Sequence, residues 1–115
     1  MYTEIAATVA KDGNLSGAID ISDMLAGDLL VPAALESTTT ICFKGCNSEG
    51  GTFVGIKDEF GTLVSIPATV NASFIYEIPN AVMKNKFIKI WTATAAGVDV
   101  AQTTAARNFM IIAKG

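Results

Sequence analysis

The sequence predicts an all-β protein: an antiparallel β-sandwich of about eight or nine strands, for which the jelly roll is one candidate topology. Two observations carry this prediction. Short runs of alternating apolar and polar residues recur along the chain, and clusters of turn residues separate them at the spacing of a β-sandwich. Because 115 residues suit one core, we expect residues 1–115 to form a single β-sandwich domain with at most one or two helical turns.

The first third of the chain predicts two strands and one ambiguous segment. Residues 4–10 form a strand-like run that ends at a Lys-Asp-Gly-Asn turn, whose residues tolerate positive φ. Residues 17–21 alternate, which places Ile19 and Ile21 inward. Residues 22–30 have some helical character, and a bulged loop that closes one end of the sandwich is an equally good interpretation.

Two features predict the strands that follow. Pro32 predicts an edge position for residues 29–35, because proline cannot donate a backbone hydrogen bond to a neighbouring strand. The β-branched residues within 38–44 predict a strand with Ile41 and Phe43 on one face and the alternate residues on the other.

The middle of the chain predicts a hairpin and a further strand. Residues 52–57 and 62–66 are strand-like and flank the sequence Asp-Glu-Phe-Gly, whose glycine, Gly61, we expect in the left-handed region of a tight turn. Residues 72–78 alternate cleanly, with Ile75 on the face opposite to that of the aromatic residues.

The last third predicts one helical turn, a long strand, a loop of small residues and a final strand. These elements lie at 79–83, 86–94, 95–104 and 106–113. In the long strand, Phe87 and Trp91 share the face opposite Ile88 and Ile90. Because the final strand is apolar on both faces, we expect it in the centre of a sheet or beneath a covering partner.

The composition excludes several classes of function. The chain has no histidine, which excludes Ser-His-Asp catalysis and His-ligated zinc. Its net charge of −3 argues against a nucleic-acid partner, since that binding depends on Lys and Arg. We expect no membrane partner, because no apolar run approaches the roughly 20 residues that span a bilayer. The N-terminus also lacks the features of a signal peptide.

No cluster of side chains predicts catalysis, a metal site or a cofactor. Three aspartates in the first third lack the spacing of a calcium-binding loop, and we expect them in turns or in solvent. Three lysines near two aromatic residues are too few to indicate a nucleic-acid site on an acidic chain. The three aspartates are Asp20, Asp23 and Asp28, and the three lysines are Lys84, Lys86 and Lys89. We therefore expect a protein that is not an enzyme and needs no cofactor.

Cys42 and Cys46 are predicted to be structural thiols in a reducing compartment. In a regular strand, Cα atoms four residues apart lie about 13 Å from each other, whereas a disulfide requires less than about 7 Å. The two cysteines would pair only if a turn began near Gly45.

Charged residues are scarce and unevenly distributed. Only 17% of the residues are charged, against about 25% in a typical soluble domain. Residues 1–36 carry a net charge of −5, and residues 78–115 carry +4. Either the strands mix in space and the asymmetry disappears, or an acidic surface meets a basic surface of a neighbouring copy. The charge-poor exterior favours assembly, because partner subunits would cover it.

Several motifs follow one another in a recognisable order. A serine leads into an apolar-acidic strand, followed by a Val-Pro-Ala segment, two glycine-containing hairpins, an aromatic-basic strand, a loop with glutamine and an apolar last strand. They lie at 16–21, 31–34, 41–52, 56–64, 87–91, Gln102 and 109–112. This order resembles a widespread group of small structural proteins of tailed bacteriophages and prophages. The resemblance covers nearly the whole chain, from which the two cysteines and the lack of an Arg-rich C-terminus depart.

The resemblance implies a virion component without enzymatic activity, made in the host bacterial cytoplasm and located on the capsid surface. We expect a capsid decoration, or cement, protein that binds the major capsid protein lattice and clamps neighbouring subunits. A homo-oligomer, with the trimer as the expected form, follows from the same resemblance. The alternatives are a neck, tail or fibre-base protein, and a carbohydrate-binding surface module that stacks a sugar on Trp91 and a tyrosine.

Four aromatic side chains are the candidate anchors of the partner interface, because aromatic residues dominate such contacts. They are Phe53, Phe60, Phe87 and Trp91. Phe60, in the predicted hairpin turn, is the best candidate for an exposed anchor, and its alternative is to fold back over the core.

Overall fold

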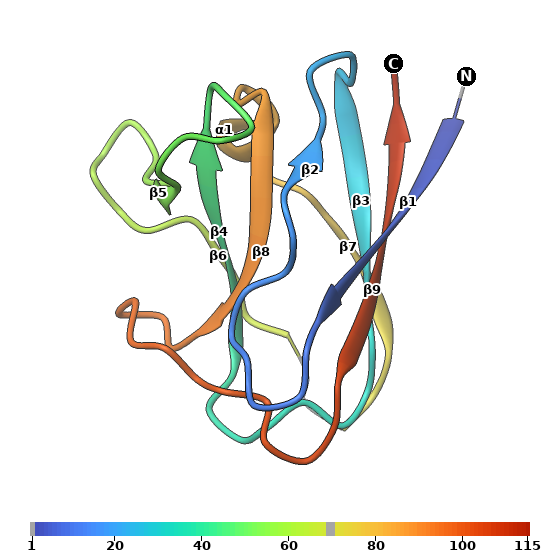
Figure 1. Ribbon diagram of the computed structural model, residues 1–115, viewed down its shortest axis with the longest axis vertical. Helices are drawn as coiled ribbons and strands as arrows, with labels where there is room; N and C mark the ends of the chain where they lie inside the picture. The colour runs from blue at the N-terminus through green and yellow to red at the C-terminus, as the bar shows by residue number, and fades with distance from the viewer. Residues whose placement is uncertain (1, 69–70) are drawn as a thin grey trace.

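The computed structural model describes residues 2–68 and 71–115, and it shows two antiparallel sheets packed as a sandwich (Figure 1). Sheet A contains, in spatial order, β1 (Tyr2–Val9), β9 (Arg107–Lys114), β3 (Ala26–Val31) and β7 (Phe74–Glu77). Sheet B contains β2 (Ile19–Asp20), β8 (Phe87–Ala93), β4 (Thr40–Cys46) and β5 (Val54–Gly55), and β6 (Ser65–Ile66) also pairs with β4. The prediction of an all-β sandwich is confirmed.

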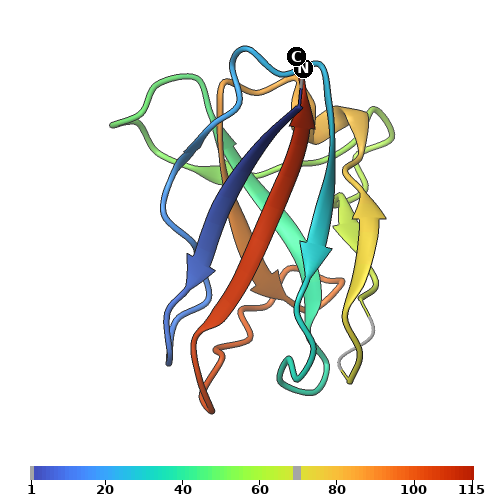
Figure 2. The same ribbon diagram turned by 90° about the vertical axis from the view of Figure 1, so that its right-hand side faces the viewer.

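The strand pairs are nested. β1 pairs with β9, β2 with β8, β3 with β7, and β4 with both β5 and β6. From β1 to β4 the chain also alternates between the two sheets, as Figure 2 shows from the side of sheet A. This arrangement, a long antiparallel hairpin rolled into two sheets, is the jelly-roll topology.

The core lies between the sheets and is formed by alternate residues of the strands. Phe43 and Ile41 of β4 are completely buried, as are Ile88 and Ile90 of β8. Sheet A contributes fully or almost fully buried residues from three strands: Val9, Leu29, Val31, Phe109 and Ile111. Their apolar area, removed from water on folding, is the main stabilising term of the sandwich.

Two sequence predictions about sheet A have opposite outcomes. The strand that precedes Pro32 was expected at an edge, and this is wrong, because β3 lies between β9 and β7. β3 ends at Val31, so the missing N–H of Pro32 removes no bond from either neighbouring strand. The expectation that the last strand is central is confirmed, since β9 lies between β1 and β3.

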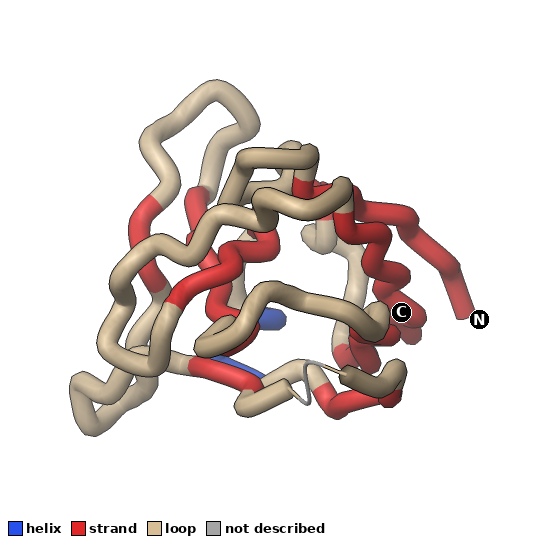
Figure 3. The backbone as a smooth tube through the Cα atoms, turned by 90° about the horizontal axis from the view of Figure 1, so that it is seen from below, coloured by secondary structure: helices blue, strands red, loops and turns tan. Residues whose placement is uncertain are grey.

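The helical turn was predicted at 79–83 and is found as α1 (Asn80–Met83). The ambiguous segment 22–30 contains a turn, with Met24 N–H donating to Ile21 C=O, and then becomes β3. Seen from below, long loops cross the end of the sandwich (Figure 3). No helix among the described residues is long and apolar enough to cross a bilayer.

Candidate functional site

The four aromatic side chains predicted as partner anchors have different environments. Trp91 is only 6% exposed and lies on the outer face of sheet B in a second cluster with Cys42 and Ala93. Its prediction as an anchor is corrected, because the ring has almost no surface left for a partner.

The covering of Trp91 comes from two loops of the chain itself. Gly55 and Gly97 lie so close that a Cβ atom at either position would be 3.3 or 3.4 Å from the indole ring. The indole Nε1–H donates a 2.8 Å hydrogen bond to Asp99 Oδ1, which fixes one loop, and Leu63 packs against the cluster from the other. Sequence alternation placed Trp91 on the outer face, but the loops turn that position into a small core.

Phe60 is the most exposed large apolar side chain, at 83%. It lies in a tight turn where Asp58 Oδ1 accepts hydrogen bonds from the backbone N–H groups of Phe60 and Thr62. Gly61 has a φ of +78°, as the sequence predicted for this turn. The alternative in which Phe60 folds back over the core is therefore excluded, and its ring stands in solvent on a well-bonded turn.

The outer face of sheet B also carries a pair of lysines that face each other. Lys44 of β4 lies directly opposite Lys89 of β8. The Lys44 Nζ lies 4.6 Å from the centroid of the Trp91 ring, and the Lys89 Nζ lies 4.6 Å from that of Phe53. Phe53 and Phe87 are both partly exposed beside this pair. Cation–π attraction therefore holds both ammonium groups on this face.

The outer face of sheet A carries an apolar band that the sequence analysis did not single out. Leu30 of β3 lies directly opposite Ile75 of β7, and the two side chains are 37% and 59% exposed. On the other side of Leu30, Met110 of β9 and then Ala6 of β1 continue the row. The clean alternation of residues 72–78 was the signal available, because it placed Ile75 outward.

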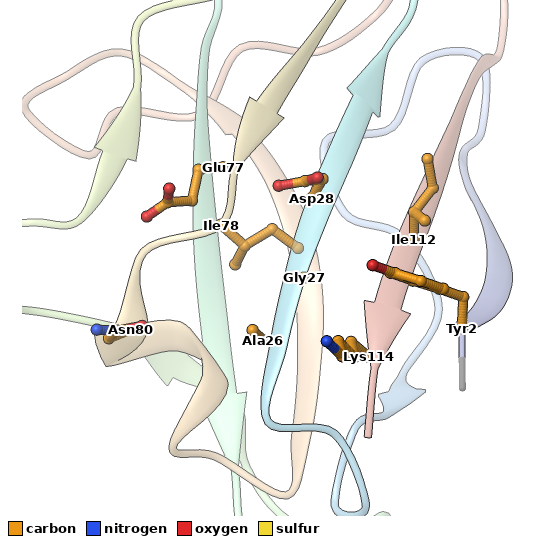
Figure 4. A pocket seen from close by; sticks show the side chains of 9 residues that line it. All are labelled: Tyr2, Ala26, Gly27, Asp28, Glu77, Ile78, Asn80, Ile112 and Lys114. Atoms are coloured by element: carbon orange, nitrogen blue, oxygen red, sulfur yellow. The ribbon is translucent and has the colours of Figure 1, made fainter.

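A row of carboxylates lies beside this band. Asp28 of β3 is directly opposite Glu77 of β7, and both line a cavity of about 350 Å³ whose floor includes Ala26 (Figure 4). The close-up shows the Asp28 side chain pointing toward the strand that carries Glu77, with Lys114 at the other end of the cavity. Like charges directly opposite each other on a sheet repel, so this pair favours a cationic neighbour.

The two cysteines are free thiols in different environments. Cys42 is buried, and burial raises the pKa of its thiol from 9.0 to about 11. Cys46 is partly exposed at the end of β4, with its Sγ 4.0 Å from Ser48 Oγ. Of the two thiols, only that of Cys46 is accessible to solvent.

Alkylation of the native protein at pH 8 is expected to modify Cys46 and spare Cys42. A pKa of about 11 lowers the thiolate fraction of Cys42 about 100-fold relative to an ordinary thiol, and burial blocks the reagent further. Mass spectrometry after iodoacetamide treatment should show one label per folded chain and two after unfolding. The Cys46→Ser variant is the control and should stay unlabelled while folded; rapid labelling of that variant would contradict the expectation.

Among the described residues, no group of three or more His, Cys, Asp or Glu side chains is close enough to hold a metal ion. Three surfaces are the candidate binding sites: the turn with Phe60, the lysine pair on sheet B, and the apolar band with its carboxylates on sheet A. Comparisons with protein-family models, with curated proteins and with solved structures found no match to this chain.

Proposed function

We propose that this protein is a non-enzymatic structural protein of a bacteriophage virion: a capsid decoration protein that binds the major capsid protein lattice and stabilises it. The observation that carries the proposal is the exposure of large apolar side chains on a small jelly roll that already has a complete core. Seven of them are more than half exposed, namely Tyr2, Leu25, Val54, Phe60, Phe74, Ile75 and Val98.

The jelly roll supports this proposal because double-sheet jelly rolls are a common architecture of viral capsid proteins. The same architecture occurs in lectins, so the fold alone does not decide between the two. The order of motifs, which resembles that of small phage structural proteins, favours the virion. A sugar-binding module that stacks its ligand on Trp91 does not fit, since that ring is 6% exposed.

The mechanism is clamping by many weak contacts. Phe60 stands on a turn held by Asp58, so little conformational entropy is lost when its ring enters a pocket between capsid subunits. One such contact is weak, but a shell carries many copies. Rupture of the shell must break many of these contacts together, which raises the free energy that rupture requires.

Replacing Phe60 with serine is expected to weaken binding to capsid shells at least about 10-fold, as for a central aromatic anchor. Because the ring is 83% exposed, the free energy of unfolding should change by less than about 0.5 kcal/mol. Binding can be measured by co-sedimentation with shells of the virus that encodes the chain, stripped of this protein. Glu59→Ser, at an exposed position of the same turn, is the matched control and should bind shells like the wild type.

Electron microscopy of the same particles tests the location. A copy number close to that of the major capsid protein supports decoration, whereas a few copies at one vertex would favour the alternative neck, tail or fibre-base role. Failure of the wild-type protein to bind shells at any concentration would overturn the proposal.

A further inference from the structure

We propose that copies of this chain bind one another head to tail, with the outer face of sheet A of one copy against the outer face of sheet B of the next. The proposal goes beyond the function proposed above and does not depend on a capsid. It rests on opposite charges and exposed apolar groups that the fold places on the two outer faces.

The outer face of sheet A is acidic beside its apolar band. The row Glu4, Ile112, Asp28 and Glu77 crosses the four strands in register, next to the row that contains Leu30 and Ile75. Lys114 is the basic residue at the end of this face, and its Nζ lies 5.8 Å from the centroid of the Tyr2 ring. In the described part of the chain, the one ion pair joins Arg107 to Glu36, so neither Asp28 nor Glu77 is paired.

The outer face of sheet B carries a basic pair near its centre. Lys44 and Lys89 lie directly opposite each other, and aromatic rings hold both ammonium groups near the surface. Two carboxylates also lie at the margin of this face, and each accepts hydrogen bonds from neutral donors within the fold. Asp20 accepts hydrogen bonds from Ser22, and Asp99 accepts one from the Trp91 indole. The partly exposed aromatic rings beside the lysines are those of Phe53 and Phe87.

The two faces are complementary in both charge and polarity. Each contains a like-charged pair directly opposite across two strands, which costs stability within one copy. Bringing the Asp28–Glu77 pair of one copy toward the Lys44–Lys89 pair of another relieves both repulsions. The apolar band around Leu30 then lies against the apolar groups beside the lysines, which removes exposed apolar surface from water.

The geometry decides the kind of assembly. The two outer faces are on opposite sides of the sandwich (Figure 1). A contact between them joins two different surfaces, so a row of copies always keeps a free sheet A face at one end and a free sheet B face at the other. Such a heterologous contact propagates from copy to copy in a row instead of closing as a two-fold dimer.

The test uses two variants, each with two charge reversals. Neither variant alone should self-associate, and a mixture of the two should associate. Asp28→Lys/Glu77→Lys makes both faces basic, and Lys44→Glu/Lys89→Glu makes both acidic. In analytical ultracentrifugation at low salt, wild type should self-associate, each double variant alone should stay monomeric, and their equimolar mixture should associate again. Raising the NaCl concentration to about 0.5 M should weaken association of the wild type at least about 10-fold.

Controls separate this contact from general charge effects and from misfolding. Glu49→Lys/Glu59→Lys and Lys11→Glu/Lys57→Glu change the net charge equally at other exposed positions, and each alone should associate like wild type. Circular dichroism and thermal unfolding must show folded variants, and Asp28→Asn/Glu77→Gln, a milder change, should also weaken association.

A wild type that is monomeric at millimolar concentration, or a mixture of reversals that fails to associate, would overturn the proposal. Because no capsid is present, this result is independent of the shell-binding test.

Discussion

Replacing Gln102 with leucine is expected to lower the free energy of unfolding by about 3–5 kcal/mol, a large part of the stability of a small domain. Gln102 is fully buried and belongs to the loop between β8 and β9. Its Oε1 accepts hydrogen bonds from Glu36 N–H at 3.0 Å and Arg107 Nε at 3.3 Å. Its Nε2 donates to Thr39 Oγ1 at 3.1 Å and to Val100 C=O at 3.3 Å.

These bonds matter because one side chain satisfies four groups on three separate segments of chain. The backbone of Gln102 adds a fourth segment, since its N–H donates to Gly13 C=O and its C=O accepts from Asp12 N–H. Leucine has a similar size but no polar atoms, so each former partner loses a hydrogen bond in a place that water reaches poorly. The segments that these bonds join should loosen together.

Urea unfolding followed by circular dichroism measures the Gln102→Leu effect. Thr8→Val is the matched control, because it removes a single exposed side-chain hydrogen bond, to Asn108, and should cost less than about 0.5 kcal/mol. A loss below about 1 kcal/mol for the leucine variant would show that the network around Gln102 is not important for stability.

Replacing Trp91 with alanine is expected to destabilise the protein by a comparable amount, about 3–5 kcal/mol, through the cavity that it leaves. The ring packs against Gly55 at the end of β5 and against Gly97 in the loop that follows β8. Both the packing of Leu63 and the hydrogen bond to Asp99 would be lost. Trp91→Phe keeps an aromatic ring and should cost about half as much.

Two measurements separate the roles of the Trp91 ring and its N–H group. Thermal unfolding gives the stability of each variant, and limited proteolysis should show faster cleavage in residues 55–63 and 95–99 of Trp91→Ala. Asp99→Ala removes only the hydrogen-bond acceptor and should cost about 1 kcal/mol. If Trp91→Ala were as stable as Asp99→Ala, the ring would not hold these loops in place.

The amino-acid pattern determined where most strands lie and which side of several of them faces the core. Ile41 and Phe43 are buried as their alternation indicated, and so are Ile88 and Ile90. Side chains on a strand alternate between two faces, so this information is local and can be obtained from a short stretch of sequence. The turn at Gly61 and the helical turn α1 were predictable for the same reason, because a few adjacent residues fix their backbone.

Tertiary structure alone decided what covers each outward side chain. Trp91 and Ile75 both point away from the core of the sandwich, yet the loop after β8 and the remote residues Gly55 and Leu63 bury the first, while the second is 59% exposed. β3 became a central strand for a similar reason, since its neighbours β7 and β9 lie more than 40 residues away in the chain. The partner of a strand or the cover of a ring depends on contacts between remote segments, and a local pattern of apolar residues holds no information about which segments meet.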